Sequence, residues 1–248
     1  MIRIRAFKSI NDIPSSKLFA QGHEQVLRDF GVMKVTSSNM DWIYNPNVYV
    51  ILVENEDGTK VFGGARIHIA DGKTPLPVED AVGEMDEGIK KKIEQDLEHG
   101  VAEMCGLWNA KEVRGSGVSV LLTKASVAKA GAKIANLLNI NTLWVLCAPY
   151  TVEMVQRAGF KIEDDLGDKG TFPYPKPDWL ATVLSLRDTE TLNSADPSER
   201  DQIFDLRLTP RQSKMEKGPK GEIIIEYDLY IENIENQVYT ENQESKSI

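Results

Sequence analysis

The segment VAEMCGLWNAKEVRGSGVSVLL, residues 101–122, holds the pattern from which the rest of the chain can be interpreted. Its first ten residues are typical of a strand, and apolar residues spaced three and four apart from Gly117 onward predict a core-facing helix. Between them lie Arg114 to Gly117. Amides at a helix start lack intrahelical partners, and glycines let a ligand approach the backbone. The loop is therefore either a cradle for an anionic ligand or a plain helix start with Ser116 as its N-cap.

Length and composition describe an ordinary globular protein. The chain has 248 residues, a length that suits one large domain or one and a half small ones, and 41% of its residues are hydrophobic and 27% charged. With 29 basic and 38 acidic residues, its net charge is −9, which argues against nucleic acid and against anionic membranes as partners. A local cluster of amides can still bind a small anion. No apolar run approaches the ~18 residues of a membrane span, and we expect no signal peptide.

Cysteine usage predicts an intracellular protein. The chain holds two cysteines, Cys105 and Cys147, each within an apolar, strand-like run, and no Cys-x-x-Cys pair. Two cysteines do not make a disulfide framework, so we expect free thiols in a reducing cytoplasm. No constellation of residues predicts a metal site.

Hydrophobic periodicity and turn residues predict an alternating series of elements. We expect an α/β (α+β) fold, in which helices flank one mixed central sheet. The expected strands cover 2–7, 48–70 as a hairpin turning at Asp57-Gly58, 101–110, 141–149, 179–188 and 221–232, and the expected helices cover 16–29, 85–98, 117–138, 150–159 and 194–208, with 71–82 as a loop.

We expect two parts in the chain. Residues 1–188 form the main domain, and residues 189–248 form a C-terminal extension of helix, strand and loose polar tail from Asn233, packed on the same domain. The strand in the extension could cap a tunnel, extend the sheet or pair with a second chain, so a homodimer is among the expectations.

The order of motifs resembles that of the GNAT acyltransferase superfamily over residues 3–187. The motifs are EMCGLWNAKEVRGSGVSVLL at 103–122, then a helix, a strand ending in CAP at 147–149, and a short helix closing on RAGF at 157–160. The acyl-CoA signature of the family is Arg/Gln-x-x-Gly-x-Gly/Ala. Arg114, Gly117 and Ser119 take its positions, with Ser in place of Gly or Ala. Gly159-Phe160 matches the end of the second CoA-binding motif.

This resemblance implies a mode of CoA binding. Main-chain amides of the loop would hold the pyrophosphate, and strands 103–109 and 142–147 would splay apart so that the acyl-pantetheine arm lies in the notch. The implied cofactor-binding residues are Leu107, Trp108, Asn109, Arg114, Gly115, Ser116, Gly117, Val118 and Ser119. The implied reaction is direct acyl transfer to an amine.

A finer resemblance connects residues 23–31, 41–77 and 102–109 with one branch of the superfamily, the acyl-homoserine-lactone synthases and the long-chain N-acyl amino acid synthases. The layout of that branch is matched by Arg28, Phe30, Trp42, Arg66 and Glu103. Of these, Arg28, Trp42 and Arg66 are the implied substrate-binding residues. Cys105 and Gly106 stand where the branch has Ser and Arg, which disfavours homoserine-lactone synthesis and leaves the acyl acceptor open.

Glu103 is the candidate catalytic base. An attacking amine must lose a proton, and burial would raise the pKa of a carboxyl toward a useful value. Two other interpretations remain, an ion pair with Arg66 or another basic residue and an exposed strand edge. Alternation predicts that Glu103, Cys105 and Leu107 share one face of the strand.

The remaining candidates each have a structural alternative. The family's usual acid, a Tyr four residues before the Gly-Phe, is replaced by Val155, so Tyr150 could protonate the leaving thiolate or only pack. Arg66 and His68 could bind an acceptor carboxylate or face solvent. Trp42 belongs to the core or to the site. We expect the two other histidines, His23 and His99, at the surface.

The resemblance implies an N-acyltransferase that moves an acyl group from acyl-CoA, or from acyl carrier protein, to the amine of a small molecule, possibly an amino acid. The alternative is a non-catalytic GNAT-fold sensor or scaffold that binds CoA or a metabolite. We favour CoA as the donor, because an acidic protein would need a local basic patch to attract acidic carrier protein. Lys124, Lys129 and Lys133 on the expected long helix are the candidates for such a patch.

Overall fold

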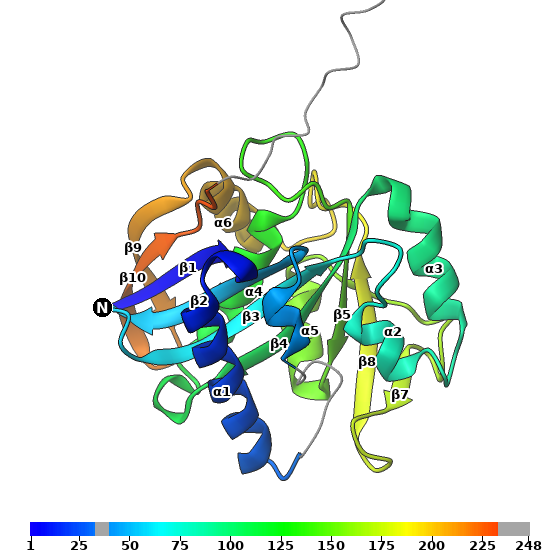
Figure 1. Cartoon of the computed structure of the whole chain (residues 1–248). Helices are drawn as coiled ribbons and strands as arrows, with labels where there is room; N and C mark the ends of the chain where they lie inside the picture. The colour runs from blue at the N-terminus through cyan, green and yellow to red at the C-terminus, as the bar shows by residue number, and fades with distance from the viewer. Residues whose placement is uncertain (33–39, 233–248) are drawn as a thin grey trace, which may run out of the picture.

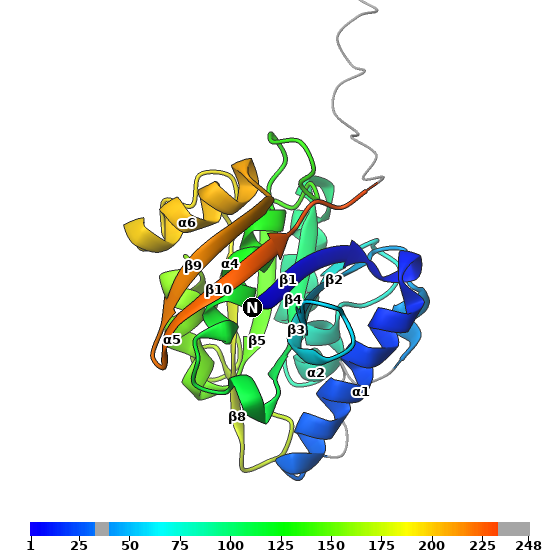
Figure 2. The same ribbon diagram turned by 90° about the vertical axis from the view of Figure 1, so that its left-hand side faces the viewer.

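A mixed β-sheet separates two helical layers in the computed structural model, which describes residues 1–32 and 40–232 (Figures 1 and 2). The predicted loose tail from Asn233 lies outside the described residues. The strands, in chain order, are β1 (Ile2–Lys8), β2 (Val48–Asn55), β3 (Val61–Ile69), β4 (Val101–Asn109), β5 (Thr142–Cys147), β6 (Lys161–Ile162), β7 (Thr171–Pro173), β8 (Leu180–Leu186), β9 (Arg211–Gly218) and β10 (Gly221–Asp228).

Helices cover both faces of this sheet. On one face lie α1 (Ile13–Asp29), α2 (Pro77–Val82) and α3 (Gly88–Asp96); on the other lie α4 (Val118–Lys129), α5 (Pro149–Arg157) and α6 (Pro197–Leu208) (Figure 2). The strand order is β6-β8-β5-β4-β3-β2-β1-β10-β9, with β7 also paired to β8. Only β4–β5 and β1–β10 pair in parallel, among the described strands. The predicted mixed sheet flanked by helices is confirmed.

The sheet's centre follows from its sequence. β2 is buried along nearly its whole length, because helices cover both of its faces. It turns into β3 through Asp57-Gly58, where Gly58 has a φ of +70° that favours glycine. Gly64 on β3 allows α1 to approach closely, since a Cβ there would lie 2.7 Å from the ring of Phe19.

Helix α4 is shorter than predicted and buried on all sides. It ends at Lys129 rather than at residue 138, and Gly131 follows with a φ of +103°. Its outer face is covered by α6, so even its lysines are buried. Lys124 is 7% exposed and pairs with Glu199 at 2.8 Å. The helix therefore has the all-round burial of a core helix rather than one apolar stripe.

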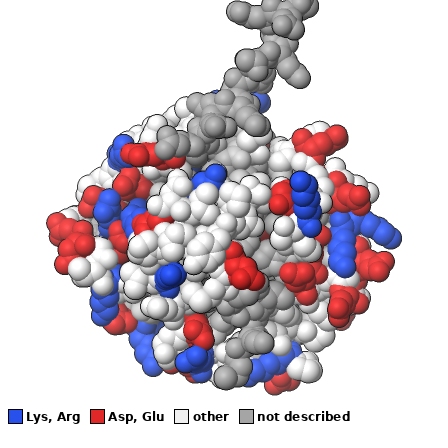
Figure 3. Space-filling view, in the orientation of Figure 1, with Lys and Arg blue, Asp and Glu red and all other residues white. Residues whose placement is uncertain are grey.

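The predicted basic patch on this helix is wrong. Lys124 and Lys129 are buried, and the Lys129 ammonium donates to the backbone and side-chain oxygens of Asn136. Lys133 is exposed but lies beyond the helix, near Glu190. In the part of the opposite face that the structure describes, Figure 3 shows acidic and basic side chains interspersed around a largely uncharged centre. The three lysines therefore do not form the predicted docking surface for an acidic carrier protein.

Two elements of the fold, α2 and β9, were not predicted from the sequence. Residues 77–82, expected as a loop, form α2, whose start is supported by the Glu79 carboxylate accepting from the amide of Leu76 at 2.7 Å. Strand β9 is polar along its length and forms a hairpin with β10. Its sequence lacks the apolar alternation by which strands are predicted, because it lies at the sheet edge.

The segment after residue 188 extends the same sheet. β10 pairs in parallel with β1, with Ile2 opposite Ile225. Ile225 is fully buried in the main core, whereas its neighbour Ile224 is 46% exposed on the other face of the strand. The hairpin therefore extends the sheet, one of the three roles considered for this strand.

We expect Ile225→Ala to lower the free energy of unfolding by about 2–4 kcal/mol, because it leaves a cavity in the shared core. The matched control is Ile224→Ala on the same strand, expected to cost less than about 1 kcal/mol. Urea unfolding monitored by fluorescence measures both. A second transition confined to the hairpin, or equal effects of the two variants, would contradict a common core.

Candidate functional site

The parallel strands β4 and β5 separate halfway along their length. They pair from Val101–Thr142 to Glu103–Trp144, after which no further pairing joins them in the described chain, although β4 runs on to Asn109 and β5 to Cys147. The implied splay of these strands is confirmed. Their free ends form the walls of a notch in the middle of the sheet.

A β-bulge in β4 decides which side chains face this notch. Cys105 lies opposite Arg66 and Trp108 opposite Gly64, so β4 has one more residue than β3 in this interval. Gly106, with a φ of +60°, lies within that interval. The bulge reverses the alternation of side chains beyond it.

The prediction that Leu107 shares a face with Glu103 and Cys105 is therefore wrong. Leu107 packs on the core beneath α4, whereas Trp108 packs on the α1 side in an edge contact with Phe19, 5.9 Å between ring centroids. Hydrophobic alternation alone cannot reveal a bulge, and only the glycine at 106 was a signal in the sequence.

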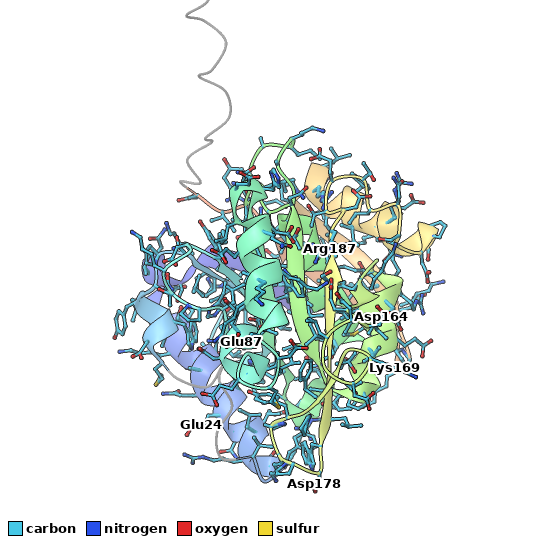
Figure 4. The ribbon with its side chains drawn as sticks, turned by 90° about the vertical axis from the view of Figure 1, so that its right-hand side faces the viewer. Glu24, Glu87, Asp164, Lys169, Asp178 and Arg187 are labelled. Carbon is cyan, nitrogen blue, oxygen red and sulfur yellow. The ribbon has the colours of Figure 1, made fainter. Side chains whose placement is uncertain are left out.

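The notch opens into a cavity of about 600 Å³. Its walls come from β4, β5, the C-terminal half of α1, the start of α5 and the segment before β8. Asp178, in that last segment, lies at the same end of the molecule as the end of α1 (Figure 4). Most of the lining is apolar or aromatic, including Val26, Leu27, Phe30, Leu107, Trp108, Val145, Leu146, Tyr174, Trp179 and Leu180.

Glu103 is the buried acid of this cavity. It is 2% exposed, and its Oε2 accepts from the Val78 amide at the start of α2, at 2.7 Å. Burial raises the pKa of Glu103 to about 8, while the Val78 hydrogen bond and the charge of Arg66 act in the lowering direction. No basic side chain of the described residues forms an ion pair with it. The exposed-edge interpretation is wrong, and the unpredicted helix α2 supplies the hydrogen-bond donor.

Arg66 lies behind the cavity wall. It is fully buried, with its guanidinium 4.3 Å from the centroid of Trp42 and its Nη2 donating to the Sγ of Cys105 at 3.8 Å. Burial lowers the pKa of Arg66 and raises that of the Cys105 thiol to about 12. Arg66 does not line the cavity, so its charge acts on the site from beneath Cys105 and Gly106.

His23 lies inside the cavity, so its expected surface position is wrong. It is 7% exposed on α1, one turn beyond Phe19. Burial, together with the charge of Arg66, lowers the pKa of His23 to about 3. The sequence carried no signal for this position, because it depends on the packing of α1 against β4. His99 is exposed, as expected.

The loop from Arg114 to Ser119 forms the predicted start of helix α4. Gly115 and Gly117 have φ values of +72° and +91°, and Gly117 is the N-cap. The amides of Val118 and Ser119 belong to the first helical turn, whose N–H groups have no carbonyl four residues earlier within the helix. Asn109 on β4 donates to the Ser119 hydroxyl at 2.6 Å, which ties the loop to the end of the splayed strand.

The C-terminal hairpin packs against this loop. A Cβ on Gly218 would lie 2.0 Å from the carbonyl oxygen of Ser116, and the Lys220 ammonium donates to the carbonyl oxygen of Arg114. The turn between β9 and β10 thus holds the shape of the loop through residues more than 100 positions later in the chain.

The other predicted residues are not all brought together. Tyr150 lines the cavity at the start of α5 and is 84% exposed. Trp42 is buried in the core between α1 and the sheet and does not line the cavity. Arg28 lies on the outer face of α1, paired with Glu24 at 2.7 Å. The structure does not place Arg28 or Trp42 in the cavity wall.

Cys105 and Cys147 are both free, as predicted. In the described part of the chain, no group of three or more potential metal ligands gathers. Within the same residues, none of the helices has the length and apolarity that crossing a bilayer demands.

Comparison with known proteins identifies the fold. No family model and no curated protein matches the chain. Among solved structures, it is similar to FeeM, an N-acyl amino acid synthase from uncultured soil microbes, at 13% identity over 81% of this chain and 98% of that chain, with a TM-score of 0.58. It is also similar to the CoA-dependent acyl-homoserine lactone synthase MesI, at 14% identity over 83% and 95% of the two chains, with a TM-score of 0.51. At these identities the likeness shows the fold, which is the GNAT fold.

We expect the stability difference between Glu103→Gln and the native protein to depend on pH. A carboxyl whose pKa rises from 4.5 to about 8 on folding stabilises the fold below pH 4.5, and this contribution is lost as the pH rises through 8. The melting temperature of Glu103→Gln should therefore rise relative to that of the native protein as the pH increases from 5 to 9.

The matched control is Glu98→Gln, because the side chain of Glu98 is 78% exposed. Its melting temperature should follow that of the native protein at every pH, as measured by calorimetry. If the melting temperature of Glu103→Gln differed from that of the native protein by the same amount at every pH, this result would contradict the raised pKa of a buried Glu103.

Proposed function

We propose that the protein transfers an acyl group from acyl-CoA to the amine of a small molecule. One observation carries the proposal: among the residues that the structure describes, Glu103 is the one buried carboxyl in the cavity between the splayed ends of β4 and β5. A thioester placed in the notch would present its carbonyl carbon near this group. The GNAT fold shared with FeeM and with the CoA-dependent synthase MesI supports the same reaction class.

Glu103 would accept the proton of the attacking amine. The amine nitrogen forms a bond to the thioester carbonyl carbon and gives its proton to Glu103, while the carbon–sulfur bond breaks and the leaving thiolate takes a proton from a separate donor. The proton held by Glu103 then replaces the one that this donor lost. Only the ionised carboxyl can act as a base, so a pKa of about 8 makes it a strong but only partly ionised base at neutral pH. Tyr150, at the cavity rim, is the proposed donor to the thiolate.

The loop at the start of α4 would hold the CoA pyrophosphate. Free amides and the positive end of the helix dipole converge there, which suits an anion even on an acidic protein. The apolar cavity walls would then surround the acyl-pantetheine arm, with Leu107 and Trp108 in the wall and Asn109 at the end of β4 beyond it. Arg66 would support the ionised state of Glu103 from below and attract an acceptor carboxylate through its field.

The alternative is a sensor or scaffold that binds acyl-CoA without turnover. Three positions favour it: Val155 in place of the tyrosine that serves the family as an acid, Gly106 in place of the arginine of the synthase branch, and Ser119 in place of Gly or Ala. Thiol release separates the two functions. Tight CoA binding without release from acetyl-CoA or long-chain acyl-CoA, in the presence of a panel of amines, would contradict the enzyme and support the sensor.

We expect Glu103→Gln to lower kcat for amine-dependent thiol release by about 10²–10⁴-fold, because the amide cannot accept the proton. In the native protein, kcat should rise with pH up to about 8, the pKa of Glu103. Below that value it should fall about tenfold per pH unit, and this limb should disappear in the variant. An unchanged kcat and pH profile in Glu103→Gln would show that Glu103 is not the base.

We expect Ser119→Asp to weaken CoA binding by about tenfold or more, because a carboxylate in the first turn of α4 would repel the pyrophosphate. The fold should survive, since acidic residues stabilise helix starts. Ser198→Asp, in the exposed first turn of α6, adds the same charge at another helix start and serves as the control. Calorimetric titration with CoA measures both variants, and equal affinities would place the pyrophosphate elsewhere.

A further inference from the structure

His23 is a buried polar side chain without a hydrogen-bond partner in the described structure. It is 7% exposed, and no hydrogen bond joins its ring nitrogens to residues 1–32 or 40–232. Its nitrogens are nevertheless not sealed in the core, because the residue lines the cavity. The ring nitrogens of His23 are not among the sealed, unpartnered polar atoms of the described side chains, so they stay accessible to a hydrogen-bonding ligand in the cavity.

His23 and Glu103 both face the cavity, from two elements that pack together, and the charge of Arg66 acts on both. His23 comes from α1, which covers the sheet, and Glu103 comes from β4 on the face that α1 and α2 cover. The charge of Arg66 acts on both groups in the direction that lowers a pKa, although burial still raises the pKa of Glu103 overall. Cys105, which contacts Arg66, also lines the cavity. A small molecule between α1 and β4 would therefore lie within the neighbourhood of both groups.

The chemistry of the two groups is complementary. With a pKa of about 3, the imidazole of His23 is uncharged at neutral pH and carries one donor and one acceptor nitrogen. Glu103 has one oxygen bound to the Val78 amide, and no hydrogen bond within the described residues occupies the other. A primary amine has two N–H bonds, so it can donate one to each group while its lone pair stays free for attack.

We propose that His23 is an acceptor-binding residue, whose imidazole receives a hydrogen bond from the attacking amine and orients it toward the thioester carbonyl in the notch. This inference rests on the proposed acyl transfer and names the side of the site from which the amine approaches, the α1 side. His23 positions the amine, and the proton still goes to Glu103.

The kinetic test compares His23→Leu with His23→Gln. Leu removes the hydrogen-bond acceptor, so we expect the KM for the amine to rise at least tenfold while the KM for acyl-CoA stays within twofold. Gln keeps an acceptor oxygen and should recover part of the loss. His99→Gln, on an exposed histidine, should change neither constant. An unchanged amine KM in His23→Leu, or an equal rise in both constants, would overturn the proposal.

The pH profile separates positioning from proton transfer. The low-pH limb of kcat should keep its midpoint in His23→Leu, because that limb belongs to Glu103. A shift of the midpoint would make His23 the base and would also overturn the assignment.

A binding measurement distinguishes failure of this inference from failure of the proposed function. The chain has three histidines, so their ring signals can be resolved by carbon–proton NMR, and those of His23 are the ones missing in His23→Leu. Benzylamine and phenylalanine, added separately to the CoA-loaded protein, are the probes. A shift of the His23 signals without any thiol release would support amine binding there and reject turnover. Turnover of a probe without a His23 shift would overturn the inference alone, and neither shift nor turnover would reject both.

Discussion

The separation of two parallel strands is the constraint on which the site depends. β4 and β5 pair over only three residue pairs, and the extra residue near Gly106 shifts the register in which β4 continues beside β3. Parallel strands normally saturate each other's backbone groups along their whole length. Here the unpaired ends leave a gap at the centre of the sheet, where backbone groups and an apolar cavity are both available to a ligand.

Burial and charge set the chemistry of that gap. Arg66 is fully enclosed and stacked on an aromatic ring, and its positive field reaches Glu103, Cys105 and His23. Desolvation raises the pKa of the carboxyl and lowers that of the imidazole, so the two groups differ in opposite directions from their behaviour in water. The cavity thus combines an uncharged imidazole, which can bind an amine, with a carboxyl that can ionise and accept the amine proton.

The C-terminal segment completes a structure that the first 188 residues leave open. α6 covers the outer face of α4, where Glu199 neutralises the buried Lys124. The hairpin adds two strands beside β1, and its turn contacts the loop at Ser116. A helix start that is to bind an anion has to keep its amides in place, and this contact holds the loop from outside.

Local patterns were enough to predict most of the strands and helices, the glycine-rich helix start and the place of Glu103 on a central strand, because periodicity and turn chemistry are encoded within a few neighbouring residues. They could not reveal the bulge at Gly106, the burial of Lys124 or the position of His23 in the cavity. Each of these depends on contacts between segments distant in the chain: β4 against β3, α6 over α4, and α1 against β4. The sequence thus specified which chemical groups are present, and tertiary packing decided which of them meet in one cavity and with what pKa, since burial and neighbouring charges arise only on folding.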